Sequence, residues 1–134
     1  MPGTWVQDNT NVDDSGSGLT TIAKAFGSNV TAGNLIAVAV GNGSNDTTCT
    51  ISDTLGHTYT QKTATWDSTN TQKHWQFFVA NILGGANTVT ATFGVSVPYR
   101  RIGIMEISGL TATPDDGAAA QVQAGSSAAD YYSS

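Results

Sequence analysis

Short β-favouring segments, separated by turn-forming clusters at intervals of about ten residues, divide most of this chain. The segment Thr88–Phe93 shows the pattern clearly, because its apolar residues alternate with threonines and would all lie on one face of a strand. Leu35–Val40 is apolar on both faces and is predicted to be a central strand. No segment shows sustained helical periodicity with capping residues. The sequence therefore predicts an all-β fold, an antiparallel two-sheet β-sandwich of about nine strands.

The predicted strands are Thr4–Gln7, Leu19–Phe26, Asn34–Val40, Thr47–Ser52, Thr58–Thr65, His74–Leu83, Thr88–Phe93, Arg100–Ser108 and Ala119–Val122. Gly84 and Gly85 separate two of them, which predicts a hairpin turn. Residues 1–123 are expected to form a single domain, and residues 124–134 an Ala/Ser-rich tail or the start of a linker.

Composition narrows the partners. The 134 residues carry a net charge of -5 with only five Lys plus Arg, so there is no basic surface for nucleic acid or for an anionic membrane. We expect a monomer whose ligands include neutral polymers. Cys49 is the only cysteine and is predicted to be a buried, inert thiol on a strand.

Tryptophans in polar surroundings are the most suggestive feature for function. Trp66 lies in the run Thr63–Asn70, Trp75 lies among Gln72, His74 and Gln76, and Trp5 precedes a polar stretch. An indole beside hydroxyl and amide groups suits a sugar ring, which has an apolar face and hydroxyl edges. The alternative for each ring is a place in the core, where most tryptophans lie.

The orientation of Trp75 stays open on the sequence. Alternation places Trp75 and Phe77 on the opposite face from His74 and Gln76. If Phe78 faces the core, however, Trp75 faces outward, and we favour this second arrangement slightly.

On the strand Arg100–Ser108, Ile102 and Ile104 are predicted to point inward. Arg101 would then point outward beside Gly103, and a glycine on an outer face leaves a shallow trough. Arg101, His74 and Gln76 are the candidate polar ligands of a sugar, with Arg101 and His74 expected on opposite parities of their strands.

Catalytic motifs are mostly absent. Glu106 is the only glutamate, and a hydrolase acting through Glu106 and an aspartate such as Asp67 is one alternative. A structural salt bridge or hydrogen bond, for instance to an arginine, is the favoured role of Glu106. His57 follows a glycine in a predicted turn, where we expect it to be solvated.

Oxygen-rich loops raise the question of calcium. Asp13 and Asp14 end the run Asn9–Asp14, and Asp46 ends the run Asn42–Asp46. No cofactor is required, and a structural calcium ion held by these aspartates competes with the interpretation that both runs are ordinary turns.

Four stretches resemble one type of β-sandwich module found in secreted multidomain bacterial proteins: Phe26–Ile36, Asp53–Thr60, Gly84–Thr90 and Glu106–Leu110. Among such modules, the chain is most similar to a non-catalytic carbohydrate-binding module attached to a bacterial endoglucanase. The resemblance implies a jelly-roll-like sandwich that binds β-glucans, including cello-oligosaccharides and xyloglucan, through surface tryptophans. It also implies export from a bacterium and a covalently linked catalytic domain.

The leading hypothesis is therefore carbohydrate binding without catalysis, through Trp66, Trp75, Trp5, Arg101, His74 and Gln76. Its rivals are a structural or adhesive spacer domain and a small glycoside hydrolase.

Overall fold

The computed structural model describes residues 3–45 and 48–110, and in this part the chain forms antiparallel strands in two sheets and no helix. The all-β class expected from the sequence is confirmed. The strands are β1 (Thr4–Asp13), β2 (Leu19–Ala25), β3 (Leu35–Asn42), β4 (Cys49–Asp53), β5 (Thr60–Asp67), β6 (Gln72–Val79), β7 (Thr88–Val97) and β8 (Arg100–Ser108). The predicted strand Ala119–Val122 and the predicted tail lie outside the described residues. Over the described ranges, no helix is long and apolar enough to cross a membrane.

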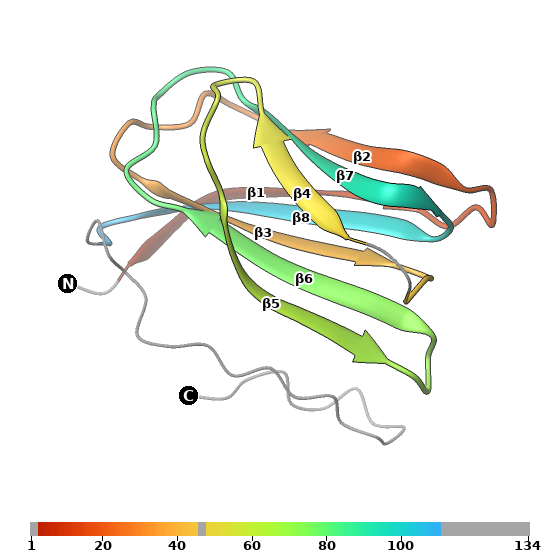
Figure 1. Ribbon diagram of the computed structural model, residues 1–134. Helices are drawn as coiled ribbons and strands as arrows, with labels where there is room; N and C mark the ends of the chain where they lie inside the picture. Colours follow the sequence, from red (N-terminus) through yellow and green to blue (C-terminus); the bar gives the residue numbers. More distant parts are fainter. Residues whose placement is uncertain (1–2, 46–47, 111–134) are drawn as a thin grey trace.

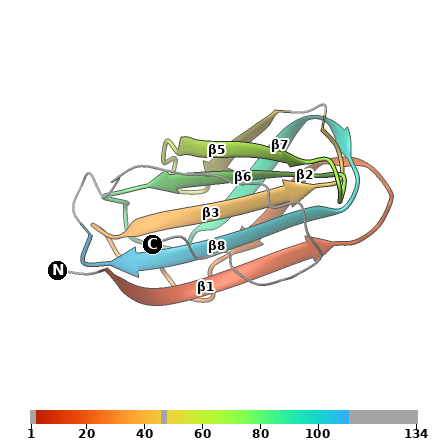
Figure 2. The ribbon, with the colours of Figure 1, turned by 90° about the horizontal axis from the view of Figure 1, so that it is seen from below.

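The two sheets face each other in a sandwich-like arrangement (Figure 1). One sheet has the strand order β1-β8-β3-β6-β5, and the other has the order β2-β7-β4. Seen from below, the five strands of the larger sheet lie side by side with β3 in the middle (Figure 2). The central position expected for Leu35–Val40 is thus confirmed, and its outer face is available for a site.

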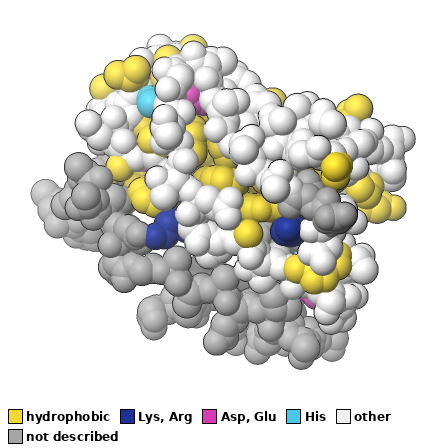
Figure 3. Space-filling view, in the orientation of Figure 1, with side chains coloured by type: hydrophobic (Ala, Val, Ile, Leu, Met, Phe, Trp, Pro, Cys, Tyr) yellow, Lys and Arg dark blue, Asp and Glu magenta, His cyan; other side chains and the backbone are white. Residues whose placement is uncertain are grey.

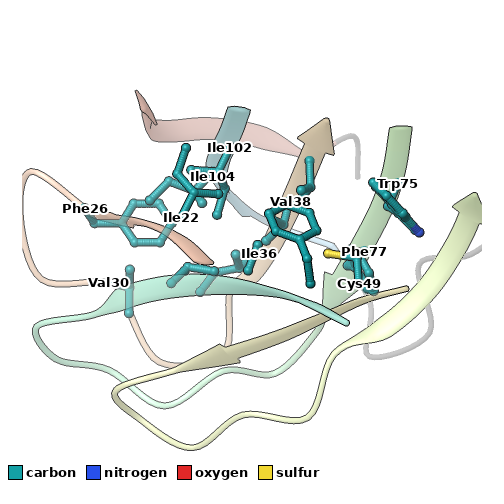
Figure 4. Close-up of a cluster of buried hydrophobic side chains, with 14 of the residues drawn as sticks. Ile22, Phe26, Val30, Ile36, Val38, Cys49, Trp75, Phe77, Ile102 and Ile104 are labelled. Carbon is teal, nitrogen blue, oxygen red and sulfur yellow. The ribbon is translucent and has the colours of Figure 1, made fainter. Parts of the chain in front are cut away.

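A single hydrophobic core fills the space between the sheets (Figure 4). Ile102 and Ile104 of β8 point into it, as the sequence predicts, and Cys49 is buried there. Burial raises the pKa of the Cys49 thiol to about 12, so the thiol is unreactive at neutral pH.

The core is less covered on the side where β4 and β5 form the edges of their sheets. The two strands do not pair with each other, and hydrophobic side chains are visible between the sheets in this view (Figure 3). The sandwich is therefore held together mainly at its other edge, where β1 and β2 meet.

Amide side chains connect the two sheets at that edge. Asn9 and Asn11 of β1 donate to the backbone carbonyls of Ala25 (3.0 Å) and Ala23 (2.9 Å) on β2. Most of the run interpreted as a calcium-binding loop is therefore strand, and its amide groups bridge the sandwich.

Two buried charged residues end the inward face of β8. Arg100 donates to the carbonyls of Ser17 and Val97 and pairs with the carboxylate of Asp13. The fully buried side chain of Glu106 lies toward the other end of the strand. Because each charge is hydrogen-bonded to neighbouring loops or strands, burial leaves neither uncompensated.

The predicted hairpin at Gly84 and Gly85 is wrong. The segment leads from β6 in the larger sheet to β7 in the smaller one, and Gly85 forms an isolated bridge with Val30. Gly85 has a φ of 136°, which suits glycine, so the pair of glycines serves a crossing between sheets rather than a tight turn.

Candidate functional site: a groove on the outer face of the larger sheet

Three rows of side chains cross the outer face of the larger sheet. In the order β1, β8, β3, β6, β5, the first row is Val12, Arg101, Gly41, His74 and Thr65, the second is Thr10, Gly103, Ala39, Gln76 and Thr63, and the third is Asp8, Met105, Ala37, Phe78 and Thr60. The register therefore puts only glycine and alanine on the middle strand β3, with longer side chains on both sides.

Two adjoining hollows result, of about 390 Å³ and about 400 Å³. Thr10, Ala39, Gln76 and Gly103 line both, so the hollows join into one depression, which we call the outer groove. Each hollow has the size of a typical small-ligand site. The trough predicted beside Gly103 is present, and a Cβ atom built on Gly103 meets only Thr10, at 3.8 Å.

The His74 imidazole covers Gly41 in the first hollow. A Cβ atom on Gly41 would lie 3.1 Å from Nδ1 of His74, so glycine makes room for the ring. Partial burial and the nearby Arg101 lower the pKa of His74, against the opposing effect of Asp67, and favour the neutral ring at neutral pH. A neutral imidazole has one donor and one acceptor, which suits sugar hydroxyls.

Arg101 stands across the groove from His74, two strands away. Its guanidinium donates to Asp14 over 2.6 Å, and both side chains are exposed. The expectation that Arg101 and His74 lie on opposite parities is wrong: both face outward, in one row with Gly41 between them. The structure thus brings Arg101, His74 and Gln76 together in the outer groove.

Tyr99 is an aromatic residue of the groove that the sequence analysis missed. It lies in the two-residue connection between β7 and β8 and lines the first hollow with an exposed fraction of 49%. Its position after Pro98, between two strands, is the only signal that the sequence offers.

The outward orientation favoured for Trp75 is wrong. Its exposed fraction is 2%, and its ring lies 6.0 Å from that of Phe93 in the core, centroid to centroid. Phe78 faces outward instead, with the Lys62 ammonium 5.8 Å from its ring centroid. A buried indole is not available for stacking on a ligand, so Trp75 is no part of the groove.

The other two tryptophans lie on different faces. Trp5, 60% exposed, pairs with Ile107 and donates its indole N–H to Asp8 at the rim of the second hollow (3.1 Å). Trp66 pairs with Lys73, two residues along from the pair of Ala64 and Trp75. Since alternate residues share a face, Trp66 points to the side of the sheet opposite the groove.

Arginines engage the aspartates proposed as calcium ligands. Asp13 pairs with Arg100, and Asp14 pairs with Arg101, while Asp46 lies outside the described residues. Hydrogen bonds from Ser15 and the Arg100 charge lower the pKa of Asp13. Among the described residues, no three His, Cys, Asp or Glu side chains cluster as a metal site requires. Calcium binding stays a prediction.

A second polar cluster surrounds Asp53. Its Oδ2 accepts hydrogen bonds from Nδ1 of His57 (2.7 Å), the Tyr59 hydroxyl (2.8 Å) and the Asn87 amide (2.9 Å). The other ring nitrogen of His57 accepts the backbone N–H of Leu83, at 2.7 Å. His57, with a side chain only 7% exposed, is thus not the solvated residue expected. With both nitrogens engaged, this Asp–His pair fixes loops and leaves no nitrogen to act as a general base.

Glu106 has three hydrogen-bond donors around its carboxylate: the amides of Gln7 (2.7 Å) and Asn34 (2.6 Å), and the backbone N–H of Thr31 (2.7 Å). None is an arginine. Asp67, by contrast, lies at the far end of β5 and accepts hydrogen bonds from Thr69 and Asn70 in the following turn. Glu106 is buried between the sheets and cannot meet Asp67 across one substrate.

Comparison with models of protein families, with curated proteins and with solved structures found no match to this chain.

Proposed function

We propose that this chain is a non-catalytic carbohydrate-binding module that holds a β-glucan, of the cello-oligosaccharide or xyloglucan type, in the outer groove. The supporting observation is the groove itself: a floor of glycine and alanine between side chains that donate and accept hydrogen bonds. Arg101, His74 and Gln76 supply the polar contacts, and Trp5 stands at the rim of the second hollow.

This mixture suits a sugar because a pyranose ring offers an apolar C–H face and a girdle of hydroxyls. The small floor residues let the ring approach the sheet, and the polar groups orient it. By analogy with bases on aromatic rings, each stacked ring contributes about 1–3 kcal/mol. One or two such contacts with a few hydrogen bonds give a dissociation constant in the micromolar to millimolar range.

The same proposal covers the setting of the module. The resemblance to endoglucanase-linked modules implies a jelly-roll-like sandwich, export from a bacterium, attachment to a glycoside hydrolase and a monomeric state. The module would then keep that hydrolase on its substrate while performing no chemistry itself.

Isothermal titration calorimetry with cellohexaose and with xyloglucan oligosaccharides tests the proposal. The informative variant is Gly103→Val, because its side chain extends into open space in the groove and fits a strand. We expect the wild type to bind and Gly103→Val to bind about tenfold more weakly or not at all. Ala23→Val, on the exposed outer face of the smaller sheet, is the matched control and should bind as the wild type does.

Two results would contradict the proposal in different ways. Full binding by Gly103→Val would place the site elsewhere on the molecule. No binding of any glucan by the wild type would favour the spacer-domain hypothesis.

A further inference from the structure

Tyr99 has a backbone conformation that its residue type disfavours. Its φ of 51° lies in the left-handed region, where a side chain with a Cβ atom is strained. Glycine or asparagine would adopt this conformation at lower cost, so fold stability alone does not explain an aromatic residue here.

Two neighbouring loops hold Tyr99 in this strained position. Its backbone N–H donates to the carbonyl of Ser15 (3.2 Å), and the carbonyl of Pro98 accepts the N–H of Gly43 (3.0 Å). A Cβ atom on Gly43 would lie 2.8 Å from the ring, and one on Gly16 would lie 3.5 Å from its hydroxyl. Glycines in both loops therefore make room for the ring, which remains half-exposed at the groove.

We infer that Tyr99 is the aromatic platform at one end of the outer groove and that the bound glucan runs along β3, from Tyr99 toward Phe78. The inference rests on the proposed function. The first sugar stacks on Tyr99, and the next lies over Gly41 between Arg101 and His74. The chain then passes over Ala39 and Gly103 to the hollow between Phe78 and Met105.

The length of this path sets the length of the ligand. From Gly43, beside Tyr99, to Ala37, beside Phe78, β3 rises about 20 Å at the usual rise per strand residue, room for about four hexose units. Trp5 stands to the side of this axis, on β1. Affinity should therefore increase from cellobiose to cellotetraose and then level off.

Calorimetry on the wild type, Tyr99→Gly and Tyr99→Phe, with cello-oligosaccharides of two to six units, tests the inference. Tyr99→Gly removes the ring together with the strain, so we expect about tenfold or more loss of affinity with an equal or higher thermal midpoint. Tyr99→Phe keeps the stacking face and should bind within about threefold of the wild type. Tyr99→Asn is a second variant without the ring, since asparagine tolerates positive φ.

Leu83→Ala, which shortens a side chain of similar exposure away from the groove, is the control and should bind normally. Wild-type affinity in both Tyr99→Gly and Tyr99→Asn, while the wild type binds cellohexaose, would overturn the role of Tyr99 and leave the proposed function intact. An equal loss in Tyr99→Phe would show that the hydroxyl, not the face of the ring, makes the contact. Affinity that continues to increase up to six units would overturn the path along β3. Failure of the wild type to bind any glucan would instead reject the proposed function.

Discussion

At the residue scale, hydrogen bonding sets the ionisation of Asp53. Burial alone raises the pKa of this carboxyl, but donors on Asn87, His57 and Tyr59 outweigh it and hold the pKa at about 2. Burial and the adjacent Asp53 raise the pKa of Tyr59, so the phenol stays a donor. Because the folded-state pKa of Asp53 is depressed below its ordinary value, its stabilisation is present above about pH 5 and is lost as the pH falls toward 2.

We therefore predict that acid removes up to about 2 kcal/mol of Asp53-dependent stability. Urea unfolding of the wild type and Asp53→Asn at about pH 6 and about pH 2.5 measures it, and the difference between the two proteins should shrink at the lower pH. Ser52→Ala, an exposed neighbour without a titrating group, should differ from the wild type equally at both pH values. A wild-type advantage over Asp53→Asn that is independent of pH would contradict the assignment.

Single residues also show where sequence reasoning succeeds. Arg101 and Gly103 follow from the apolar alternation of Ile102 and Ile104, which only the core can satisfy. Trp75 does not follow, because the sequence does not reveal that Lys62 covers Phe78 on the outer face. Tyr99 is equally hidden, since its exposure depends on glycines in two loops distant in sequence.

At the element scale, β1 is the strand that the sequence predicted least well. The predicted strand ended at Gln7, whereas β1 continues to Asp13, since the inward positions Asn9 and Asn11 are polar and hid the alternation. Their side chains bond the backbone of β2, a partner distant in sequence that composition does not reveal. Where apolar residues fill the inward positions, as in β8, the predicted bounds are those observed.

These amide bridges predict that β1 fastens one edge of the sandwich. The double variant Asn9→Ala, Asn11→Ala loses a hydrogen bond at each position and should be less stable by about 2 kcal/mol in urea unfolding. Thr10→Ala, which changes the outward face of the same strand, should be less stable by no more than about 0.5 kcal/mol. A double variant as stable as Thr10→Ala would show that the bridges contribute nothing.

At the scale of the whole molecule, a low charge density extends into the groove. Charged residues are 11% of the chain, and in the groove Arg101 is paired with Asp14 while the lowered pKa of His74 favours its neutral ring. Lys62 and Asp8 bring opposite charges to the second hollow. A surface of this kind neither attracts nor releases many counterions when a neutral chain binds, in contrast to the salt-dependent binding of polyanions.

Binding of a neutral β-glucan should therefore change by less than about twofold between about 0.05 M and about 0.5 M sodium chloride, because screening has no ligand charge to act on. Calorimetry with cellohexaose at both salt concentrations gives the comparison. An acidic oligosaccharide of the same length, such as an oligogalacturonate, is the matched ligand control and should bind far more weakly at either concentration, since the net charge of -5 opposes it. Tight binding of the acidic chain, falling steeply with added salt, would instead assign the groove to an anionic polymer held by Arg101, Lys62 and a protonated His74.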